Sequence, residues 1–179
     1  CIRDRHNQLT RDRAEKPYQA LFGVIQGAQY EDLRRKAAQD LGSMVADGIS
    51  FDGFGIGGAL DKSKLGTIVR WVNEELPREK PRHLLGIGEP TDLFIGVENG
   101  ADTFDCVAPS REARTSAVYT DKGRFNVSGG AYRKDFTPID EKCGCYTCAH
   151  YSKAYLNHLF RGKEILAATL ATIHNEYYI

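Results

Sequence analysis

Short apolar runs alternate with amphipathic segments between residues 18 and 107, and this alternation restricts the possible folds more than any other feature of the chain. Four runs are typical of buried strands that end in glycine or a polar residue, namely residues 20–27, 50–58, 83–88 and 103–107. Strands that alternate with helices usually form a parallel sheet built from βα units. The sequence therefore predicts an α/β fold with ligands at the carboxyl edge of the sheet.

The segments that follow the first three runs carry helical signals. Apolar residues recur at helical spacing in segments 30–41 and 64–76, as Leu33, Ala37 and Leu41 and as Leu65, Val69 and Val72. We expect Thr91 to cap a third helix and Gly100 to close it. Four βα units are half of a (β/α)8 barrel, although a small doubly wound domain has the same pattern. Because the chain begins at Cys1 without an initiator methionine, we expect a fragment of a larger barrel.

The pattern changes after Val107. The polar, arginine-rich stretch that follows predicts hairpin strands around Asp121–Gly123, with Tyr119, Phe125, Val127 and Tyr132 in or beside them. Two helices are expected over residues 149–161 and 163–177, the second with Leu166, Leu170, Ile173 and Tyr177 on one apolar face. This region is expected to be an insertion or an appended subdomain.

Composition excludes several classes of protein. With 41% hydrophobic residues the chain can bury a core, and with 24 acidic against 24 basic residues it has no overall attraction for a polyanion. A nucleic-acid partner must therefore be inferred from local sites. No run approaches the roughly 18 apolar residues of a membrane span, and the start of the chain has no apolar signal core. Three of the five cysteines are clustered rather than spread as a disulfide framework, so we expect a cytoplasmic protein without membrane contact.

A C-x-C-x-x-C knuckle formed by Cys143, Cys145 and Cys148 is the strongest chemical signal. Zn²⁺ takes four nitrogen or sulfur ligands tetrahedrally, and His174 could supply the fourth from the last expected helix. A site with four protein ligands has no open position and would be structural. His150 and His158 are alternative fourth ligands, and three buried thiols with a core histidine are the alternative without a metal.

Asp105 lies at the end of the fourth expected strand, where barrel enzymes hold nucleophiles and bases. The alternative is a structural carboxylate that caps a turn or pairs with an arginine. Arg111 and Arg114 follow, and guanidinium groups suit phosphate binding. They could equally form a solvated face that pairs with Glu112 or Asp102.

Glycines at the strand ends are weaker signals. Gly57 and Gly58 would let the backbone approach a flat ligand, and the amide of Gln26 could contact the edge of a heterocycle. Such glycines also occur in ordinary tight turns.

Eight segments in this order and spacing resemble the C-terminal half of the tRNA-guanine transglycosylases, also called queuine tRNA-ribosyltransferases: FGVIQG, FGIGG, HLLGIG, FDCVAPSREAR, RFNV, YRKDFTPID, CGCYTCAHYSKAYLNHL and TIHNEYY. The resemblance covers residues 18–179. It implies the C-terminal part of a (β/α)8 TIM barrel with an inserted zinc-binding subdomain. Residues 1–110 would supply barrel βα units, and residues 111–179 the subdomain and the return to the last barrel helix.

The resemblance also implies an activity, which is the exchange of the wobble guanine of GUN-anticodon tRNAs for a 7-deazaguanine, preQ1 or queuine, in queuosine biosynthesis. The reaction would pass through a covalent Asp-ribosyl intermediate. The implied partners are tRNA, guanine, the 7-deazaguanine base and a second copy of the chain in a homodimer. The implied site residues are the nucleophile Asp105, the base-binding Gln26, Gly58 and Gly86, the tRNA-binding Arg111 and Arg114, and the ligands of a structural Zn²⁺, Cys143, Cys145, Cys148 and His174.

One loop departs from the family pattern. Residues 59–63 are ALDKS where the family usually has LAVGE or LSGGE, so Ser63 replaces the acid expected to contact an aminomethyl group. The identity of the inserted base is therefore left open. The family's general acid and base come from the N-terminal half, so we expect these 179 residues alone to be inactive.

Three alternatives to a catalytic bacterial-type enzyme are considered. The first is the family's non-catalytic transglycosylase-like subunit, against which the presence of Asp105 argues. The second is a zinc-stabilised RNA-binding module with no chemistry. The third is the archaeal branch, whose additional RNA-binding domain has no counterpart in this sequence.

Overall fold

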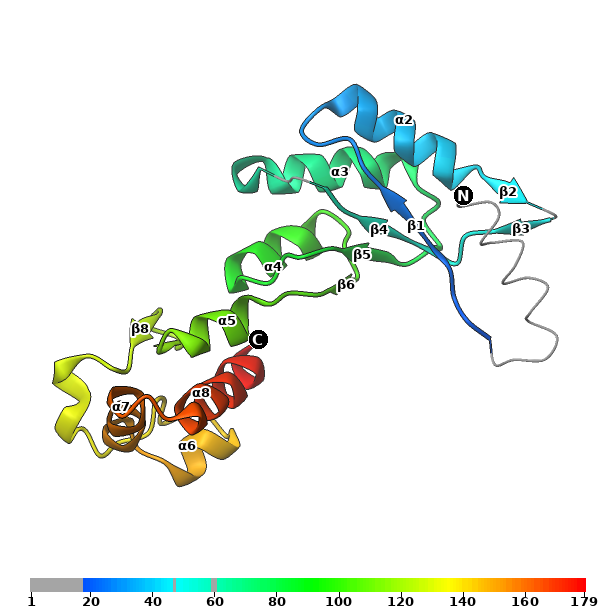
Figure 1. Ribbon diagram of the computed structural model, residues 1–179. Helices are drawn as coiled ribbons and strands as arrows, with labels where there is room; N and C mark the ends of the chain where they lie inside the picture. Colours follow the sequence, from blue (N-terminus) through cyan, green and yellow to red (C-terminus); the bar gives the residue numbers. More distant parts are fainter. Residues whose placement is uncertain (1–17, 47, 59–60) are drawn as a thin grey trace. The chain divides into compact units, whose positions relative to one another are not determined.

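The computed structural model describes residues 18–46, 48–58 and 61–179 (Figure 1). The start of the chain lies outside the described residues, as do Ala59 and Leu60 of the loop that departs from the family pattern, residues 59–63, here called the departing loop. The chain divides into two compact units, of which the first ends at Asp105 and the second begins at Cys106.

A parallel sheet forms the centre of the first unit. Its four strands lie side by side in chain order, as β1 (Phe22–Ile25), β4 (Gly53–Ile56), β5 (Arg82–Leu84) and β6 (Thr103–Phe104). In this register Ile25 lies opposite Ile56, which in turn lies opposite Leu84. The four predicted strands are confirmed, but each is shorter than expected, since β1 and β4 lose residues at both ends and β5 and β6 end earlier at the carboxyl edge of the sheet.

Helices α2 (Glu31–Gly42), α3 (Leu65–Glu75) and α4 (Pro90–Glu98) connect the strands and lie in a row along the sheet (Figure 1). Right-handed crossovers between parallel strands in chain order place successive helices on the same face. In the described sheet the strand order does not reverse, as it would in a doubly wound fold. A short antiparallel pair, β2 (Val45–Ala46) and β3 (Ile49–Ser50), follows α2.

The two faces of the sheet differ in burial. Ile25, Ile56 and Leu84 are fully buried against the helices, where Leu65, Val69 and Val72 form the predicted apolar stripe of α3. On the other face Phe22, Val24 and Leu85 remain 36%, 40% and 36% exposed. Within the described residues, this second face carries apolar side chains that are only partly covered.

Helix α2 is turned relative to the prediction. Leu33 is 49% exposed, whereas Arg34 and Ala38 are fully buried, so the predicted stripe is wrong by one position. Ala37 and Leu41 pack only at the margin of the core. The buried position of Arg34 follows from its hydrogen bonds, because its guanidinium group donates to three backbone carbonyls, at the end of β1, in the turn after β1 and just after β4.

The start of α4 also differs from the prediction. Its N-cap is Glu89, and Pro90 occupies the first turn, so Thr91 is not the cap. Proline suits the first helical position because its fixed φ is already helical and its missing N–H is not needed there. Gly100 ends the helix as predicted, with a left-handed φ of +94°.

The second unit is mainly helical. It contains α5 (Ala108–Arg114), the antiparallel pair β7 (Ala117–Val118) and β8 (Phe125–Asn126), the 3₁₀ helix η2 (Gly130–Lys134), α6 (Tyr146–His150), α7 (Lys153–Arg161) and α8 (Ile165–Tyr178). The predicted hairpin around Asp121–Gly123 is confirmed, but Tyr132 lies in η2 rather than in a strand.

Two predictions about the helices of this unit are corrected. The helix expected over residues 149–161 is two helices, because Ser152 caps α7 by accepting a hydrogen bond from the backbone N–H of Tyr155. In α8 the predicted apolar face is confirmed only at Leu170, because Leu166 is 44% and Tyr177 61% exposed. Besides Leu170 the buried face carries Ala167, Ala171, His174 and Asn175, and the small side chains of the two alanines suit the packing of α8 against α5.

Candidate active site and metal centre

The carboxyl ends of the four parallel strands meet at one edge of the sheet. Gln26 follows β1, Gly58 follows the end of β4, Gly86 follows β5 and Asp105 follows β6. The structure therefore brings four of the predicted site residues to the edge at which α/β proteins bind ligands.

The carboxylate of Asp105 is held by two donors from the segment around β5. The backbone N–H of Gly86 lies 3.1 Å from its Oδ1, and Nε2 of His83 lies 2.9 Å from the same oxygen. The other ring nitrogen of His83, Nδ1, lies 2.8 Å from the hydroxyl oxygen of Thr103. When that hydroxyl donates to Nδ1, the imidazole proton is on Nε2 and faces Asp105.

These contacts favour the charged form of the candidate nucleophile. A hydrogen bond from the Gly86 N–H, and then one from His83, lower the pKa of Asp105 below its ordinary value, so the carboxylate stays ionised to a lower pH than a free aspartate. Its side chain is 59% exposed, and among the described residues no group donates to Oδ2. Asp105 is therefore an oriented carboxylate whose Oδ2 accepts no hydrogen bond from the described residues.

Sequence reasoning missed His83. The available signal was the strand register, since His83 lies directly opposite Thr103 and two strand positions from the end that carries Asp105. Gly86 was predicted to line a pocket, and the structure gives its backbone N–H a contact with the candidate nucleophile.

Gln26 lies across the two glycines that follow β4. A Cβ atom at Gly58, which has a φ of +92°, would lie 2.6 Å from Oε1 of Gln26. A Cβ atom at Gly57 would lie 3.3 Å from Nε2 of the same amide. A side chain at Gly58 would displace the amide, so this glycine keeps a flat surface beside Gln26.

The departing loop forms its own polar contacts. Oδ1 of Asp61 accepts hydrogen bonds from the backbone N–H and the hydroxyl of Ser63, at 3.0 and 2.7 Å. Those contacts lower the pKa of Asp61. Lys62 forms ion pairs with Glu89 at 2.8 Å and with Asp92 at 3.1 Å. The carboxylate of this loop therefore belongs to Asp61, while Ser63 serves as its hydrogen-bond donor.

The cysteine knuckle and His174 form one cluster in the second unit. Nδ1 of His174 lies 3.6 Å from the sulfurs of Cys143 and Cys145 and 3.3 Å from that of Cys148. All four donor atoms lie within 4.8 Å of one another. In a tetrahedral zinc site the sulfur and nitrogen ligands are about 3.6 Å apart, so the distances from His174 to the three sulfurs match those of a zinc site.

The environment of the cluster favours metal binding over free thiolates. Burial raises the pKa of Cys148 to about 12 and also raises that of Cys143, so a metal ion would be needed to displace their protons at neutral pH. Burial lowers the pKa of His174, which keeps its ring neutral. The Nε2–H of His174 donates to the carbonyl of Tyr119 at 2.7 Å, which leaves Nδ1 facing the sulfurs as an acceptor.

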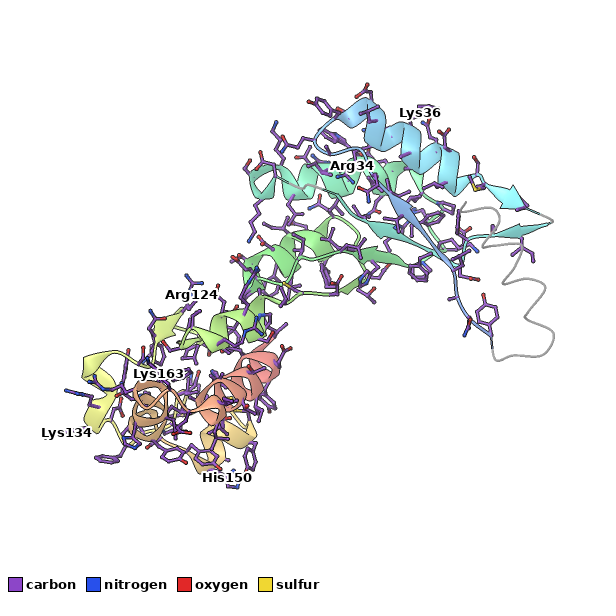
Figure 2. All side chains as sticks on the ribbon, in the orientation of Figure 1. Arg34, Lys36, Arg124, Lys134, His150 and Lys163 are labelled. Carbon is purple, nitrogen blue, oxygen red and sulfur yellow. The ribbon has the colours of Figure 1, made fainter. Side chains whose placement is uncertain are left out.

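The two alternative histidines lie away from the cluster. His150 is exposed, and its Nδ1 lies 2.9 Å from the carbonyl of Tyr146 (Figure 2). His158 is exposed on α7. Among the described residues, His174 is the histidine that the structure places with the three cysteines.

Arg111 and Arg114 lie on α5, three positions apart and both exposed. Their expected acidic partners are engaged elsewhere, because Glu112 pairs with Arg124 at 2.7 Å and Asp102 accepts from the backbone N–H of Arg82. Within the described part of the chain neither arginine forms an ion pair. The alternative pairing of these arginines with Glu112 or Asp102 is therefore not found among the described residues.

No helix in the ranges that the structure describes has the length and apolar character needed to span a bilayer.

Comparison with known proteins gives one consistent result. The sequence profile of the family described as Queuine tRNA-ribosyltransferase matches residues 2–179. Proteins of the same name from Thermoanaerobacter pseudethanolicus and Shewanella denitrificans are 51% and 47% identical to the chain over 90% and 93% of its length. A protein of that name from Pediococcus pentosaceus is 44% identical over 90% of the chain. The chain spans 42% to 44% of the length of these relatives.

Proposed function

The chain belongs to the queuine tRNA-ribosyltransferase family, and from this premise we propose that it is part of a tRNA-guanine transglycosylase, a pentosyltransferase of queuosine biosynthesis. The reaction exchanges the wobble guanine of GUN-anticodon tRNAs for a 7-deazaguanine such as preQ1 or queuine. The observation that carries the proposal is the oriented, ionised carboxylate of Asp105 on the same sheet edge as Gln26 and Gly58.

Asp105 is the nucleophile of this reaction. Its free Oδ2 attacks C1′ of the ribose as the bond from C1′ to guanine breaks, and the departing base takes up a proton. The product is an ester between Asp105 and the ribose. An incoming 7-deazaguanine loses a proton and displaces the carboxylate, which restores a glycosidic bond and the free enzyme.

Gln26, Gly58 and Gly86 form the base-binding side of the site. The flat, glycine-lined surface beside the Gln26 amide suits a planar heterocycle that has left its stack. Gly86 has a second role, because its N–H orients Asp105. Residue 63 is a serine whose hydroxyl donates to Asp61, so position 63 offers no carboxylate to the inserted base. The side group of that base is therefore not assigned.

The Cys143, Cys145, Cys148 and His174 cluster holds a structural Zn²⁺ in this proposal. Four protein ligands fill a tetrahedral shell, and the metal when bound would link α6 and the residues just before it to α8.

Arg111 and Arg114 bind the tRNA backbone near the anticodon. Two exposed guanidinium groups on one short helix, without ion pairs among the described residues, are available to phosphate oxygens. A tRNA substrate also implies a cytoplasmic enzyme.

The four-stranded sheet is one half of a (β/α)8 barrel in this proposal. Strands in chain order with helices along one face are the arrangement of a barrel wall. The exposed apolar face of Phe22, Val24 and Leu85 then faces the barrel interior. Residues 1–110 would form barrel units, and residues 111–179 the zinc-binding subdomain and the last barrel helix.

A second copy of the chain is the proposed oligomeric partner, in a homodimer. The second unit exposes a group of aromatic rings. The ring centroids of the stacked Tyr151 and Tyr155 are 5.2 Å apart, and those of Tyr146 and His150 are 4.4 Å apart. Tyr146 and Tyr155 are 53% and 39% exposed, as expected for aromatic residues that a protein partner would cover.

Trapping of the covalent intermediate tests the function. We expect the full-length protein to form a denaturation-resistant adduct with a GUN-anticodon tRNA, and Asp105→Asn to bind that tRNA without forming the adduct. Asp102→Asn is the matched control, because Asp102 lies just before the opposite end of β6 and accepts from a backbone N–H. The absence of an adduct in the unchanged protein would favour the non-catalytic subunit or the RNA-binding module.

A further inference from the structure

Arg34 is a buried cation beneath the candidate base-binding edge. Its side chain leaves α2 on the side of the sheet and is fully buried, whereas Lys36 points outward on the same helix (Figure 2). Its Nε donates to the carbonyl of Ala28 at 2.8 Å, and its Nη1 lies 2.6 Å from the carbonyl of Gly57 and 3.3 Å from that of Ile25. One guanidinium group therefore connects the end of β1, the turn after it and the end of β4.

The turn that Arg34 holds is conformationally unusual. Ala28 has a left-handed φ of +49°, which costs an L-residue about 1 kcal/mol relative to the right-handed region. A Cβ atom at the preceding Gly27 would lie 2.8 Å from the backbone nitrogen of Arg34. The hydrogen bond from Arg34 to Ala28 compensates for this conformation, and the turn is the one that follows Gln26 directly.

The remaining nitrogen of Arg34, Nη2, is buried and has no hydrogen-bond partner among the described residues. Buried donors are nearly always satisfied, so this nitrogen requires an explanation. The position that a Cβ atom of Gly58 would take lies 3.3 Å from Nη2 and 2.6 Å from Oε1 of Gln26. Nη2 and the amide oxygen of Gln26 therefore both border the position that a side chain at residue 58 would fill.

The charge of Arg34 acts on the Gln26 amide. No carboxylate among the described residues forms an ion pair with Arg34, so the cation is not neutralised locally. The Gln26 oxygen lies on the side of the cation, and its Nε2 lies toward Gly57. A carbonyl dipole is stabilised when its oxygen faces a buried positive charge, so this orientation is favoured over the flipped amide.

We propose that Arg34 is a positioning residue of the base-binding edge, which fixes the Gln26 amide with its oxygen inward and its NH₂ group presented to the base. The proposal rests on the function proposed above. Nη2 donates to Oε1 of Gln26 across the space beside Gly58 when a base is bound. The exposed NH₂ group of Gln26 then donates to a carbonyl oxygen on the edge of that base.

This arrangement selects the chemical class of the base. Guanine and 7-deazaguanines carry a carbonyl oxygen that accepts from an NH₂ group, whereas 2-aminopurine is guanine without that oxygen. A site built around a fixed donor rejects a ligand that leaves the donor unpaired. If the amide could flip freely, this discrimination would be weaker.

The test compares the affinities of guanine and 2-aminopurine for the full-length protein by calorimetry. Arg34→Lys keeps the charge but loses the rigid fork of donors. We expect it to reduce the ratio of guanine to 2-aminopurine affinity about tenfold, equivalent to one lost hydrogen bond. The matched control is Arg35→Lys, because Arg35 lies next on the same helix and pairs with Glu31, Glu74 and Glu75 outside the core. Its affinity ratio should equal that of the unchanged protein.

Equal loss of both affinities in Arg34→Lys would show a structural role alone and overturn the proposal, as would an unchanged ratio. If Arg34→Lys does not fold, Gln26→Glu replaces the NH₂ donor by a second acceptor and leaves Arg34 in place. Guanine affinity should then fall at least tenfold with little change for 2-aminopurine, and an unchanged ratio would reject the proposal. Failure of the unchanged protein to bind guanine would instead reject the proposed function, and this positioning role with it.

Discussion

Nε2 of His83 lies 2.9 Å from Oδ1 of Asp105, and the same oxygen accepts the backbone N–H of Gly86. Both donors belong to β5 and the turn after it, while Asp105 follows β6. The orientation of the carboxylate therefore depends on the pairing of these two strands, in which His83 lies opposite Thr103.

Removal of the His83 donor should slow the covalent step. We expect His83→Phe to reduce kcat about tenfold, as for one hydrogen bond to a charged group, with little change in the KM for tRNA. His83 and Gly86 together lower the pKa of Asp105, so loss of His83 should raise it toward the ordinary value. The acidic limb of the kcat/KM profile should then move to higher pH, because more of the carboxylate is protonated at a given acidic pH.

His83→Gln is the matched variant for this experiment, since its amide NH₂ can still donate to Asp105. It should retain more activity than His83→Phe, and the acidic limb of its kcat/KM profile should be displaced less. Equal defects in the two variants, or an unmoved limb in both, would contradict a role for the hydrogen bond.

Metal content should depend on His174 and not on His158. We expect about one zinc ion per chain, its loss in His174→Ala and its retention in His158→Ala, as measured by elemental analysis after dialysis. Because burial raises the pKa values of Cys143 and Cys148, protons should compete strongly for the thiolates, and the zinc should be released as the pH falls. Retention of stoichiometric zinc in His174→Ala would assign the fourth ligand elsewhere.

The chemical motifs could be predicted from the sequence, because local spacing carried them. One short segment contains Cys143, Cys145 and Cys148, and Asp105 directly follows an apolar run. These residues could therefore be named as site candidates without knowledge of contacts between distant parts of the chain. The fourth ligand needed the structure, since spacing alone left His150 and His158 open and burial favours His174.

The positioning residues could not be predicted in this way. His83 contacts Asp105 across 22 positions, and Arg34 contacts Gly57 across 23, so both depend on strand register. The burial of Arg34 also contradicts the apolar spacing of α2, since backbone carbonyls rather than apolar neighbours hold it in the core. The same limit explains the error in α8, where Ala167 and Ala171 are buried because they permit close helix packing and not because they are large.

The arginines of α5 should contribute to RNA binding through charge. We expect Arg111→Ala and Arg114→Ala each to weaken tRNA binding and to reduce its salt dependence by about one phosphate contact, with the zinc content unchanged. Arg124→Ala is the control, because Arg124 is already paired with Glu112 and should change the salt slope less (Figure 2). Salt slopes that equal that of the unchanged protein would assign both arginines to a solvated face.

Asp135 should make the second unit sensitive to acid. Lys153 and then Thr137 lower the pKa of Asp135 to about 2, below its value in an unfolded chain of about 3.9. A lowered folded pKa gives stability that is complete above the unfolded value and is lost as the pH falls toward 2. We expect Asp135→Asn to remove about 1 kcal/mol at pH 7, since the pair is partly screened by solvent, and to flatten the pH dependence between 4 and 2. Denaturant unfolding at several pH values measures both effects, and an unchanged dependence would show that the pair adds no stability.

The 179-residue chain by itself should not exchange guanine. It spans 42% of the length of its Thermoanaerobacter relative, and the resemblance places the general acid and base in the part of the family that precedes it. Without a proton donor the guanine leaves poorly even when Asp105 is correctly oriented. The partly exposed Phe22, Val24 and Leu85 would also lack the barrel strands proposed to cover them.

We expect no incorporation of radiolabelled guanine into tRNA by the isolated chain, and recovery of exchange when the preceding half of the barrel is added. Zinc content and circular dichroism serve as controls for folding of the isolated chain. Robust turnover by that chain would show that the second acid lies within these residues.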